Sequence, residues 1–161
     1  KHRLNRPSSL VDLSGIAEMK GIRREGDALV IGALTKHEAV ATSPEVKAAI
    51  PMLAFVAKHI GDTQVRNRGT MGGSVANNDP AADYPAAVLG LGATVHTSRR
   101  KIAADEFFLG MFTTALEQDE LLTAISFPIP EKAGYAKMRN PASRYVMAGA
   151  FVSRGPMGVR M

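Results

Sequence analysis

A segment with little side-chain bulk, residues 62–80, constrains this chain more than any other feature of its sequence. It holds Gly69, Gly72 and Gly73 among serine, threonine and asparagine residues, with few large apolar side chains. Glycine lets the main chain approach a ligand closely and adopt positive φ, so that successive N–H groups can face an anion. The composition predicts an open loop over 69–74 that cradles a phosphate-bearing ligand. The alternative is a tight turn between core strands.

The common phosphate-binding motifs do not fit this segment. No Gly-Lys-Ser/Thr ends it, as in a Walker A loop, and the spacing of the Rossmann glycine fingerprint is absent. Thr70 and Ser74 add hydroxyl donors, and Asp83 follows a few residues later. A carboxylate beside a phosphate site is unfavourable unless it accepts hydrogen bonds from ligand hydroxyls, such as those of a ribose or ribityl chain. Asp83 is therefore either a sugar ligand or a carboxylate at a helix start.

Helical and strand patterns flank the segment without regular alternation. Gly26, between two short strand-like runs, signals a hairpin. Thr35 with Glu38 forms a capping box, and Pro44 and Pro51 suit first helical positions. This mixture favours an α+β fold over a doubly wound α/β fold. The expected strands are 10–13, 21–24, 28–31, 93–97, 101–103, 121–127, 134–138 and 144–152, and the expected helices begin near 35, 43, 51 and 81.

Composition excludes several classes of protein. The 161 residues include no cysteine, which excludes disulfides, thiol nucleophiles and cysteine-ligated metal centres and is consistent with a reducing compartment. The net charge of +5 suits a phosphate-bearing ligand or an acidic partner. The basic residues of the chain are dispersed, however, and aromatic residues make up only 6% of it, so nucleic-acid binding is not expected. No apolar run is long enough to span a membrane, and no secretion leader is evident.

Candidate catalytic and metal-binding residues are also missing. The serines lack the spacing of a catalytic triad or nucleophile elbow. The histidines lack metal-ligand spacing, so they are expected to be surface or packing residues, and no metal site is predicted. These histidines are His2, His37, His59 and His96.

Three motifs together resemble one known family. They are Ile60-Gly61-Asp62, the run QVRNRGTMGGS over 64–74, and NDPAADYP over 78–85. They resemble the FAD-binding subunit of the molybdenum hydroxylases, of the kind found as the medium subunit of aerobic carbon monoxide dehydrogenase and as the flavin domain of xanthine dehydrogenase. The likeness runs from Arg3-Leu4 to the segment 140–145. It implies a vanillyl-alcohol-oxidase-like (PCMH-type) FAD-binding region over 1–130, with a mixed sheet and flanking helices, and the first strands of a small C-terminal α+β domain over 131–161.

The resemblance also implies which residues contact a noncovalently bound FAD. The segment 70–74 would face the diphosphate, Asp83 would bind a sugar hydroxyl, and Lys137 would lie near the flavin ring, where a cation stabilises negative charge on the reduced ring. Arg66 and Arg68 could pair with the diphosphate or with an acidic partner subunit. The implied cofactor-binding residues are Ile60, Gly61, Gly69, Thr70, Met71, Gly72, Gly73, Ser74, Ala76, Asn77, Asp83, Leu122 and Lys137.

As a function, the resemblance implies a cytoplasmic oxidoreductase subunit. In the intact enzyme, substrate would be oxidised at a molybdenum cofactor in a large subunit. Electrons would pass through iron–sulfur clusters in a small subunit to FAD and then to an external acceptor. The family's earlier glycine-rich loop is not found here and the first residue is Lys1, so a piece of a longer chain is expected. The alternatives are a cofactor-free docking module of the same complex and a basic nucleotide-binding domain.

Overall fold

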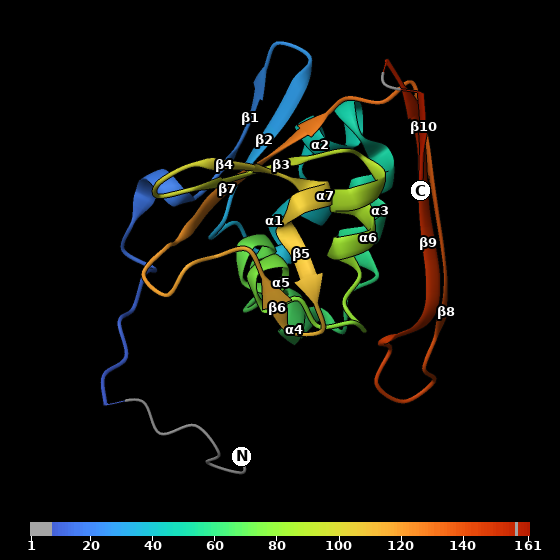
Figure 1. The fold of residues 1–161 in the computed structure, drawn as a ribbon. Coiled ribbons are helices and arrows are strands. Elements are labelled where there is room, and N and C mark those ends of the chain that lie inside the picture. Colours follow the sequence, from blue (N-terminus) through green and yellow to red (C-terminus); the bar gives the residue numbers. More distant parts are fainter. Residues whose placement is uncertain (1–7, 157) are drawn as a thin grey trace.

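A five-stranded antiparallel sheet forms one side of the molecule. The computed structural model describes residues 8–156 and 158–161 and orders the strands β1-β2-β7-β3-β4. β7, from late in the chain, lies between the β1–β2 hairpin and the β3–β4 hairpin (Figure 1). These strands are β1 (Ile22–Glu25), β2 (Ala28–Gly32), β3 (Thr94–Thr97), β4 (Lys101–Ala103) and β7 (Leu122–Pro128).

Short helices form a second layer against this sheet. The main core fills the space between the two, and it includes Leu29, Ile31, Ile125 and Phe127 from the strands, all of them fully buried. A 3-10 turn, Ala17–Met19, precedes β1. The helices are α1 (His37–Thr42), α2 (Pro44–Ala49), α3 (Pro51–Lys58), α4 (Thr63–Arg66), α5 (Met71–Asn77), α6 (Tyr84–Gly90) and α7 (Ala104–Phe107).

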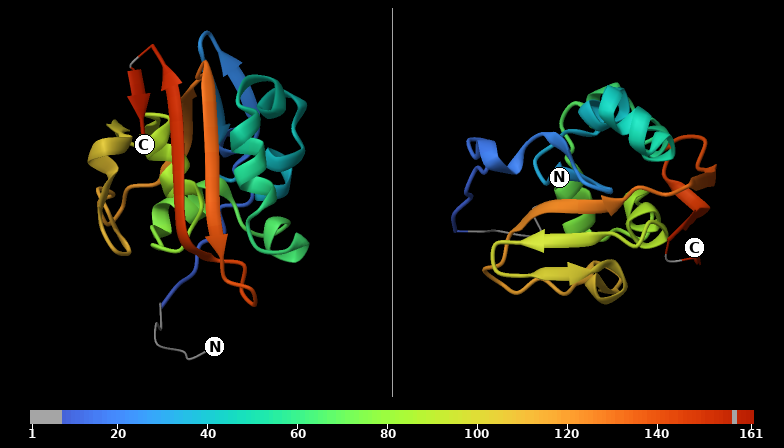
Figure 2. Two further views of the ribbon diagram at one scale, coloured as in Figure 1. Left: turned by 90° about the vertical axis from the view of Figure 1, so that its right-hand side faces the viewer. Right: turned by 90° about the horizontal axis from the view of Figure 1, so that it is seen from above.

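A second antiparallel sheet covers the opposite side of the helices. It consists of β8 (Lys132–Arg139), β9 (Val146–Gly155) and β10 (Gly158–Arg160), and Figure 2 shows it in front of the helical layer. Phe151 of β9 packs so closely on α6 that a Cβ added to Gly90 would lie 2.7 Å from its ring. The hydroxyl of Ser153 also donates a 2.6 Å hydrogen bond to the Gly90 carbonyl. A two-stranded sheet, β5 (Phe108–Gly110) with β6 (Thr113–Thr114), completes the described strands.

The structure confirms the α+β class and most of the predicted elements. The hairpin turns at Gly26, whose φ is +59°, and α2 begins at Pro44 behind a Ser43 hydroxyl that accepts from the Val46 N–H. The predicted mixed sheet was wrong, because all pairs among the described strands are antiparallel. The predicted strand 10–13 was also wrong: it forms no strand, and Leu10 is 88% exposed because no neighbouring strand pairs with it.

The predicted Thr35 helix cap was a further error. α1 begins at His37 with no side-chain cap, because the Thr35 hydroxyl instead bonds both the N–H and the carbonyl of Gly21. This pair of hydrogen bonds, 3.0 and 3.1 Å long, fastens the link between β2 and α1 to the residue before β1. A threonine hydroxyl can serve either purpose, so the sequence pattern alone did not decide between them.

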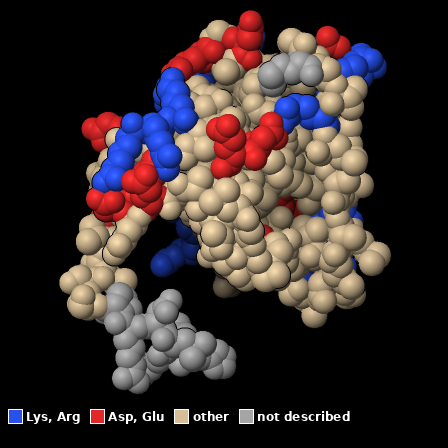
Figure 3. Space-filling view, in the orientation of Figure 1, with Lys and Arg blue, Asp and Glu red and all other residues tan. Residues whose placement is uncertain are grey.

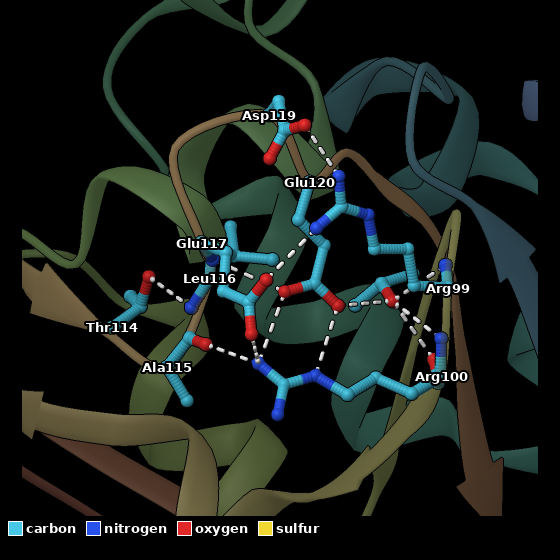
Figure 4. A network of polar contacts seen from close by, with 9 residues as sticks. Arg99, Arg100, Thr114, Ala115, Leu116, Glu117, Asp119 and Glu120 are labelled. Carbon is cyan, nitrogen blue, oxygen red and sulfur yellow. Dashed lines mark hydrogen bonds and ion pairs between the residues drawn. The ribbon is translucent and has the colours of Figure 1, made fainter.

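Charged residues stabilise the loop that leads into β7. Figure 4 shows Arg99 and Arg100, from the β3–β4 turn, pairing with the acidic residues of this loop. The Glu120 side chain is fully buried, and its carboxylate accepts from Arg100 and Thr97. These bonds and the Glu117 N–H lower the pKa of Glu120 to about 2. Figure 3 shows acidic and basic side chains intermingled on this face rather than an extended basic stripe.

Candidate functional site

One pocket of about 560 Å³ collects residues from five parts of the chain. Its walls come from the end of α3 with α4, from the start of α5, from the link between α5 and α6, from the β8–β9 turn, and from His37 of α1. It lies at the end of the molecule where Figure 1 draws α4 and α5. The lining residues are His37, Ile60, Gly61, Val65, Arg68, Gly69, Thr70, Gly73, Ser74, Asn77, Asp79, Ala81, Ala82, Asp83, Ser143, Arg144 and Tyr145.

The glycine-rich segment corrects the loop prediction. Residues 71–77 form helix α5, capped by the Thr70 hydroxyl, which accepts from the Gly73 N–H at 3.2 Å. The N–H groups of Met71 and Gly72 donate to the carbonyls of Thr35 and Ala33 at 3.0 and 2.9 Å. These amides are therefore bound within the protein, and the row of anion-facing N–H groups expected over 69–74 is not what the structure contains. Thr70 and Ser74 line the pocket, so the polar groups that this segment offers to a ligand are side-chain hydroxyls.

The three glycines of this segment serve different purposes. A Cβ on Gly72 would lie 2.5 Å from the Ala33 side chain, so this glycine lets α5 pack on the end of β2. A Cβ on Gly69 would lie 2.5 Å from Nε2 of His37, so that glycine makes room for the imidazole. Gly73 is exposed and lines the pocket, and a Cβ there would meet only the Thr70 hydroxyl, at 3.0 Å. Of these three glycines, only Gly73 has side-chain space that opens into the pocket.

Asp83 lines the pocket and forms a buried ion pair. The Lys137 ammonium donates to its Oδ1 at 2.7 Å, and the two side chains are only 7% and 5% exposed. The Tyr135 hydroxyl donates to the same oxygen at 2.8 Å, and burial together with this bond raises the pKa of Tyr135. Lys137 also donates to the carbonyl of His59 at 2.8 Å. This cluster ties β8 to the helices that carry the pocket.

Three arginines lie in or near the pocket, and they differ in whether the protein or the pocket takes up their guanidinium groups. Arg66 is held by Glu38 at 2.7 Å and by the Ile60 carbonyl at 3.3 Å, and it does not line the pocket. Arg68 does line it, and so does Arg144, which comes from the β8–β9 turn and has a φ of +63°. Of the two arginines considered from sequence, Arg68 is therefore the one available to a ligand in the pocket.

The sequence-derived site residues divide into two groups. Ile60, Gly61, Gly69, Thr70, Gly73, Ser74, Asn77 and Asp83 line the pocket. The other five do not. Met71 and Gly72 are buried against the core, Leu122 is 6% exposed in β7, and Ala76 is half-buried on α5. Lys137 does not line the pocket itself but contacts two residues that do, Asp83 and Arg144.

Sequence reasoning missed His37 as a pocket residue. It was expected to be a surface or packing residue, and it is indeed packed at 4% exposed, but it also lines the pocket, which was not expected. Burial, with a smaller contribution from Arg66, lowers its pKa to about 4, so the imidazole is neutral near pH 7. A lone histidine carries no spacing signal that could have found it. His2, by contrast, lies outside the described residues.

The part of the chain that the structure describes, residues 8–156 and 158–161, contains no evident metal site. Within it, no group of three or more histidine, aspartate or glutamate residues is arranged to hold a metal ion. None of its helices has the length and apolar character that crossing a bilayer requires.

Comparison with known proteins identifies the class to which this α+β chain belongs. A solved structure of carbon monoxide dehydrogenase from Hydrogenophaga pseudoflava, which lacks the molybdenum-pyranopterin moiety, matches with a TM-score of 0.90 and 39% identity over 94% of this chain and 55% of that chain. Quinoline 2-oxidoreductase from Pseudomonas putida 86 matches with a TM-score of 0.90 and 33% identity, again over 94% and 55%. The first of these proteins is a dehydrogenase and the second an oxidoreductase by name.

The family follows from the sequence. A family model described as the FAD binding domain in molybdopterin dehydrogenase matches residues 1–130, so the chain belongs to that family. The carbon monoxide dehydrogenase medium chain of Hydrogenophaga pseudoflava is 39% identical over 161 residues, covering 94% of this chain and 55% of that protein. The nicotine 6-hydroxylase medium subunit of Paenarthrobacter nicotinovorans is 34% identical over 155 residues, covering 93% and 55%. The chain thus spans about half the length of these relatives.

Proposed function

We propose that this chain is the FAD-binding part of an oxidoreductase subunit of the molybdenum hydroxylase type. The observation that supports this best is the pocket of about 560 Å³, which gathers eight of the thirteen residues that the family resemblance assigns to the cofactor. Those eight are spread from Ile60 to Asp83, and folding brings them to one cavity. The volume lies in the range of roughly 300–1,000 Å³ that is usual for small-molecule and cofactor sites.

The lining of the pocket fits a dinucleotide. Arg68 and Arg144 supply positive charge for a diphosphate, and the hydroxyl groups of Thr70 and Ser74 can donate hydrogen bonds to it. Asp83 keeps acceptor capacity for a sugar hydroxyl, because its bonds from the protein fall on Oδ1. The apolar lining suited to a flat ring system comprises Ile60, Val65, Ala81 and Ala82.

The site residues that do not line the pocket have supporting roles in this proposal. Lys137 brings positive charge close to the pocket through its contact with Asp83 and fixes the orientation of that carboxylate. Met71, Gly72, Ala76 and Leu122 support the site by packing, since they hold α5 against the sheet or lie in the sheet itself. Bound FAD would supply the redox chemistry, while the chain binds and orients it.

The proposal extends to the assembly. The relatives are named as medium chains of dehydrogenases or as the medium subunit of a hydroxylase. By analogy, we propose that this chain works in the cytoplasm beside a large subunit that oxidises substrate at a molybdenum cofactor. A small subunit with iron–sulfur clusters would pass electrons to the FAD site, and an external acceptor would receive them.

We also propose a division of the chain near residue 130. Residues 1–130 would be a FAD-binding domain of the vanillyl-alcohol-oxidase (PCMH) type, and residues 131–161 the start of the C-terminal domain. Two observations support this boundary. The family match ends at residue 130, and the separate three-stranded sheet begins with β8 at Lys132.

A pair of substitutions at Gly73 tests the proposed function. Gly73→Asp and Gly73→Asn place side chains of nearly equal size in the pocket, and they differ in charge. If a diphosphate binds there, Gly73→Asp should lower FAD affinity at least about 100-fold, because like charges brought together at a binding site cost several kcal/mol. Gly73→Asn should lower FAD affinity much less. The measurement is the visible flavin absorbance retained by the purified protein, with a titration of FAD. Stoichiometric flavin in Gly73→Asp would contradict the proposal.

A further inference from the structure

Two neighbouring buried side chains carry polar atoms without partners. Nδ1 of His37 and the hydroxyl of Tyr84 have no hydrogen-bond partner among the described residues, although both atoms are buried. Their rings pack together, with centroids 5.3 Å apart and planes tilted by 60°. An unsatisfied buried polar atom costs about 1–3 kcal/mol, so two in contact require an explanation. His37 lines the pocket, and Tyr84 directly follows the pocket residue Asp83.

The chemistry of the two groups is complementary. A neutral imidazole has one N–H donor and one acceptor nitrogen. The structure contains no hydrogen bond between these two atoms, but a Tyr84 hydroxyl that stays protonated can donate to Nδ1 after a small shift of either ring. Burial and the neighbouring Asp83 charge raise the pKa of Tyr84, so the hydroxyl keeps its proton. When Nδ1 accepts, the imidazole proton resides on Nε2.

Nε2 lies on the side of the ring that faces the glycine segment. A Cβ on Gly69 would be 2.5 Å from it, so this nitrogen occupies space that any other residue at 69 would fill. The backbone N–H of His37 donates to the Gly69 carbonyl at 3.1 Å, which fixes the residue beside this segment. Thr70 follows immediately, and Arg68 precedes; both line the pocket.

We propose that His37 is a ligand-binding residue of the pocket, with Nε2–H donating to a diphosphate oxygen of the bound dinucleotide and Tyr84 positioning it by donating to Nδ1. The inference rests on the proposed function, because it concerns the same ligand. It adds a neutral, directional donor to the positive charge of Arg68. Tyr84 touches no ligand and acts only through His37.

Nitrogen NMR of the histidine-labelled protein tests the tautomer and the contact together. Near pH 7 the free protein should show His37 with the proton on Nε2 and an unprotonated Nδ1. Addition of FAD or of ADP, which shares the diphosphate, should shift the Nε2 signal, whereas riboflavin, which has no phosphate, should leave it in place. The Nδ1–H tautomer in the free protein, or an Nε2 signal that ignores both FAD and ADP, would overturn the inference.

Amide substitutions separate the two ring nitrogens. His37→Gln places an amide N–H near the position of Nε2, and His37→Asn near that of Nδ1. Loss of a hydrogen bond to a charged acceptor weakens binding about 10- to 100-fold. His37→Asn should show that loss for FAD and ADP alike, and His37→Gln should remain within about threefold of the native protein. Equal affinities of the two variants for ADP would refute the contact.

Two further variants control for folding. His96 hydrogen-bonds Ser126 in the main sheet and does not line the pocket, so His96→Gln should leave ADP and FAD affinity unchanged. Tyr84→Phe should preserve the fold but return a mixture of His37 tautomers, because the donor to Nδ1 is lost. An unchanged His37 tautomer in Tyr84→Phe would remove Tyr84 from the proposal. If the native protein binds neither FAD nor ADP, the proposed function fails; if it binds both and the His37 variants match it, only this inference fails.

Discussion

Lys137→Met should destabilise this protein far more than a typical loss of a salt bridge. The Lys137 ammonium is 7% exposed and donates to Asp83 at 2.7 Å, to the His59 carbonyl at 2.8 Å and to the Arg144 carbonyl at 3.3 Å. Methionine has nearly the same length and fills the same space, so the change removes the charge and the donors without creating a large cavity.

The expected loss of stability in Lys137→Met follows from the Asp83 carboxylate, which the substitution leaves buried without its cation. Without Lys137, the Asp83 carboxylate stays 5% exposed with Tyr135 as its protein donor. Breaking a buried ion pair by removing one partner costs about 3–5 kcal/mol, because the other charge is left uncompensated. The matched control is Arg23→Met. Arg23 pairs with Glu25 at 2.5 Å, but these side chains are 53% and 55% exposed, and an exposed pair contributes about 0–1 kcal/mol.

Urea denaturation at neutral pH, followed by circular dichroism, gives the free energy of unfolding for each variant. The double variant Lys137→Met with Asp83→Asn should recover part of the loss, because a neutral amide no longer needs the ammonium. A Lys137→Met variant no less stable than Arg23→Met would refute the reasoning. So would a double variant whose loss equals the sum of the two single losses, because the pair would then not be coupled.

Two other predictions concern the edges of the fold. Glu120 has a pKa of about 2 in the folded protein, below its ordinary 4.5, so the stability it gives through Arg100 is present above pH 4.5 and lost as the pH falls toward 2. In Glu120→Gln, the urea midpoint should fall less steeply as the pH is lowered across that range. A midpoint that falls as steeply as in the native protein would contradict the attribution of this pH dependence to Glu120. Gly90→Ala should cost about 1–3 kcal/mol by pushing Phe151 away from α6, measured as a lower melting temperature, and an unchanged value would mean that β9 is not docked as described.

Local patterns predicted the elements that local forces determine. The hairpin at Gly26 follows from a two-residue turn that needs positive φ, and the start of α2 follows from a serine hydroxyl before Pro44. These features need no knowledge of distant residues. Thr35 shows the limit, since its hydroxyl had a local and a distant partner available and the structure uses the distant one, Gly21.

Helix α5 could not be predicted from its sequence, because its stability does not come from helix propensity. Glycine disfavours a helix by about 1 kcal/mol relative to alanine, and α5 contains Gly72 and Gly73 near its start. The helix forms because the N–H groups of Met71 and Gly72 bond carbonyls in the link that follows β2, and because Gly72 packs on Ala33. Those partners lie more than thirty residues earlier in the chain.

The same tertiary packing changes how the glycines should be tested. Sequence alone treats the glycines at 69, 72 and 73 as one cradle, but a side chain at 69 or 72 would collide with His37 or Ala33 before it met any ligand. Loss of flavin in a Gly69 or Gly72 variant would therefore report damaged packing as readily as a damaged site. Gly73 alone leaves its side-chain space to the pocket. A pair of substitutions at Gly73 that match in size and differ in charge thus separates ligand binding from folding, which substitutions at the other two positions do not.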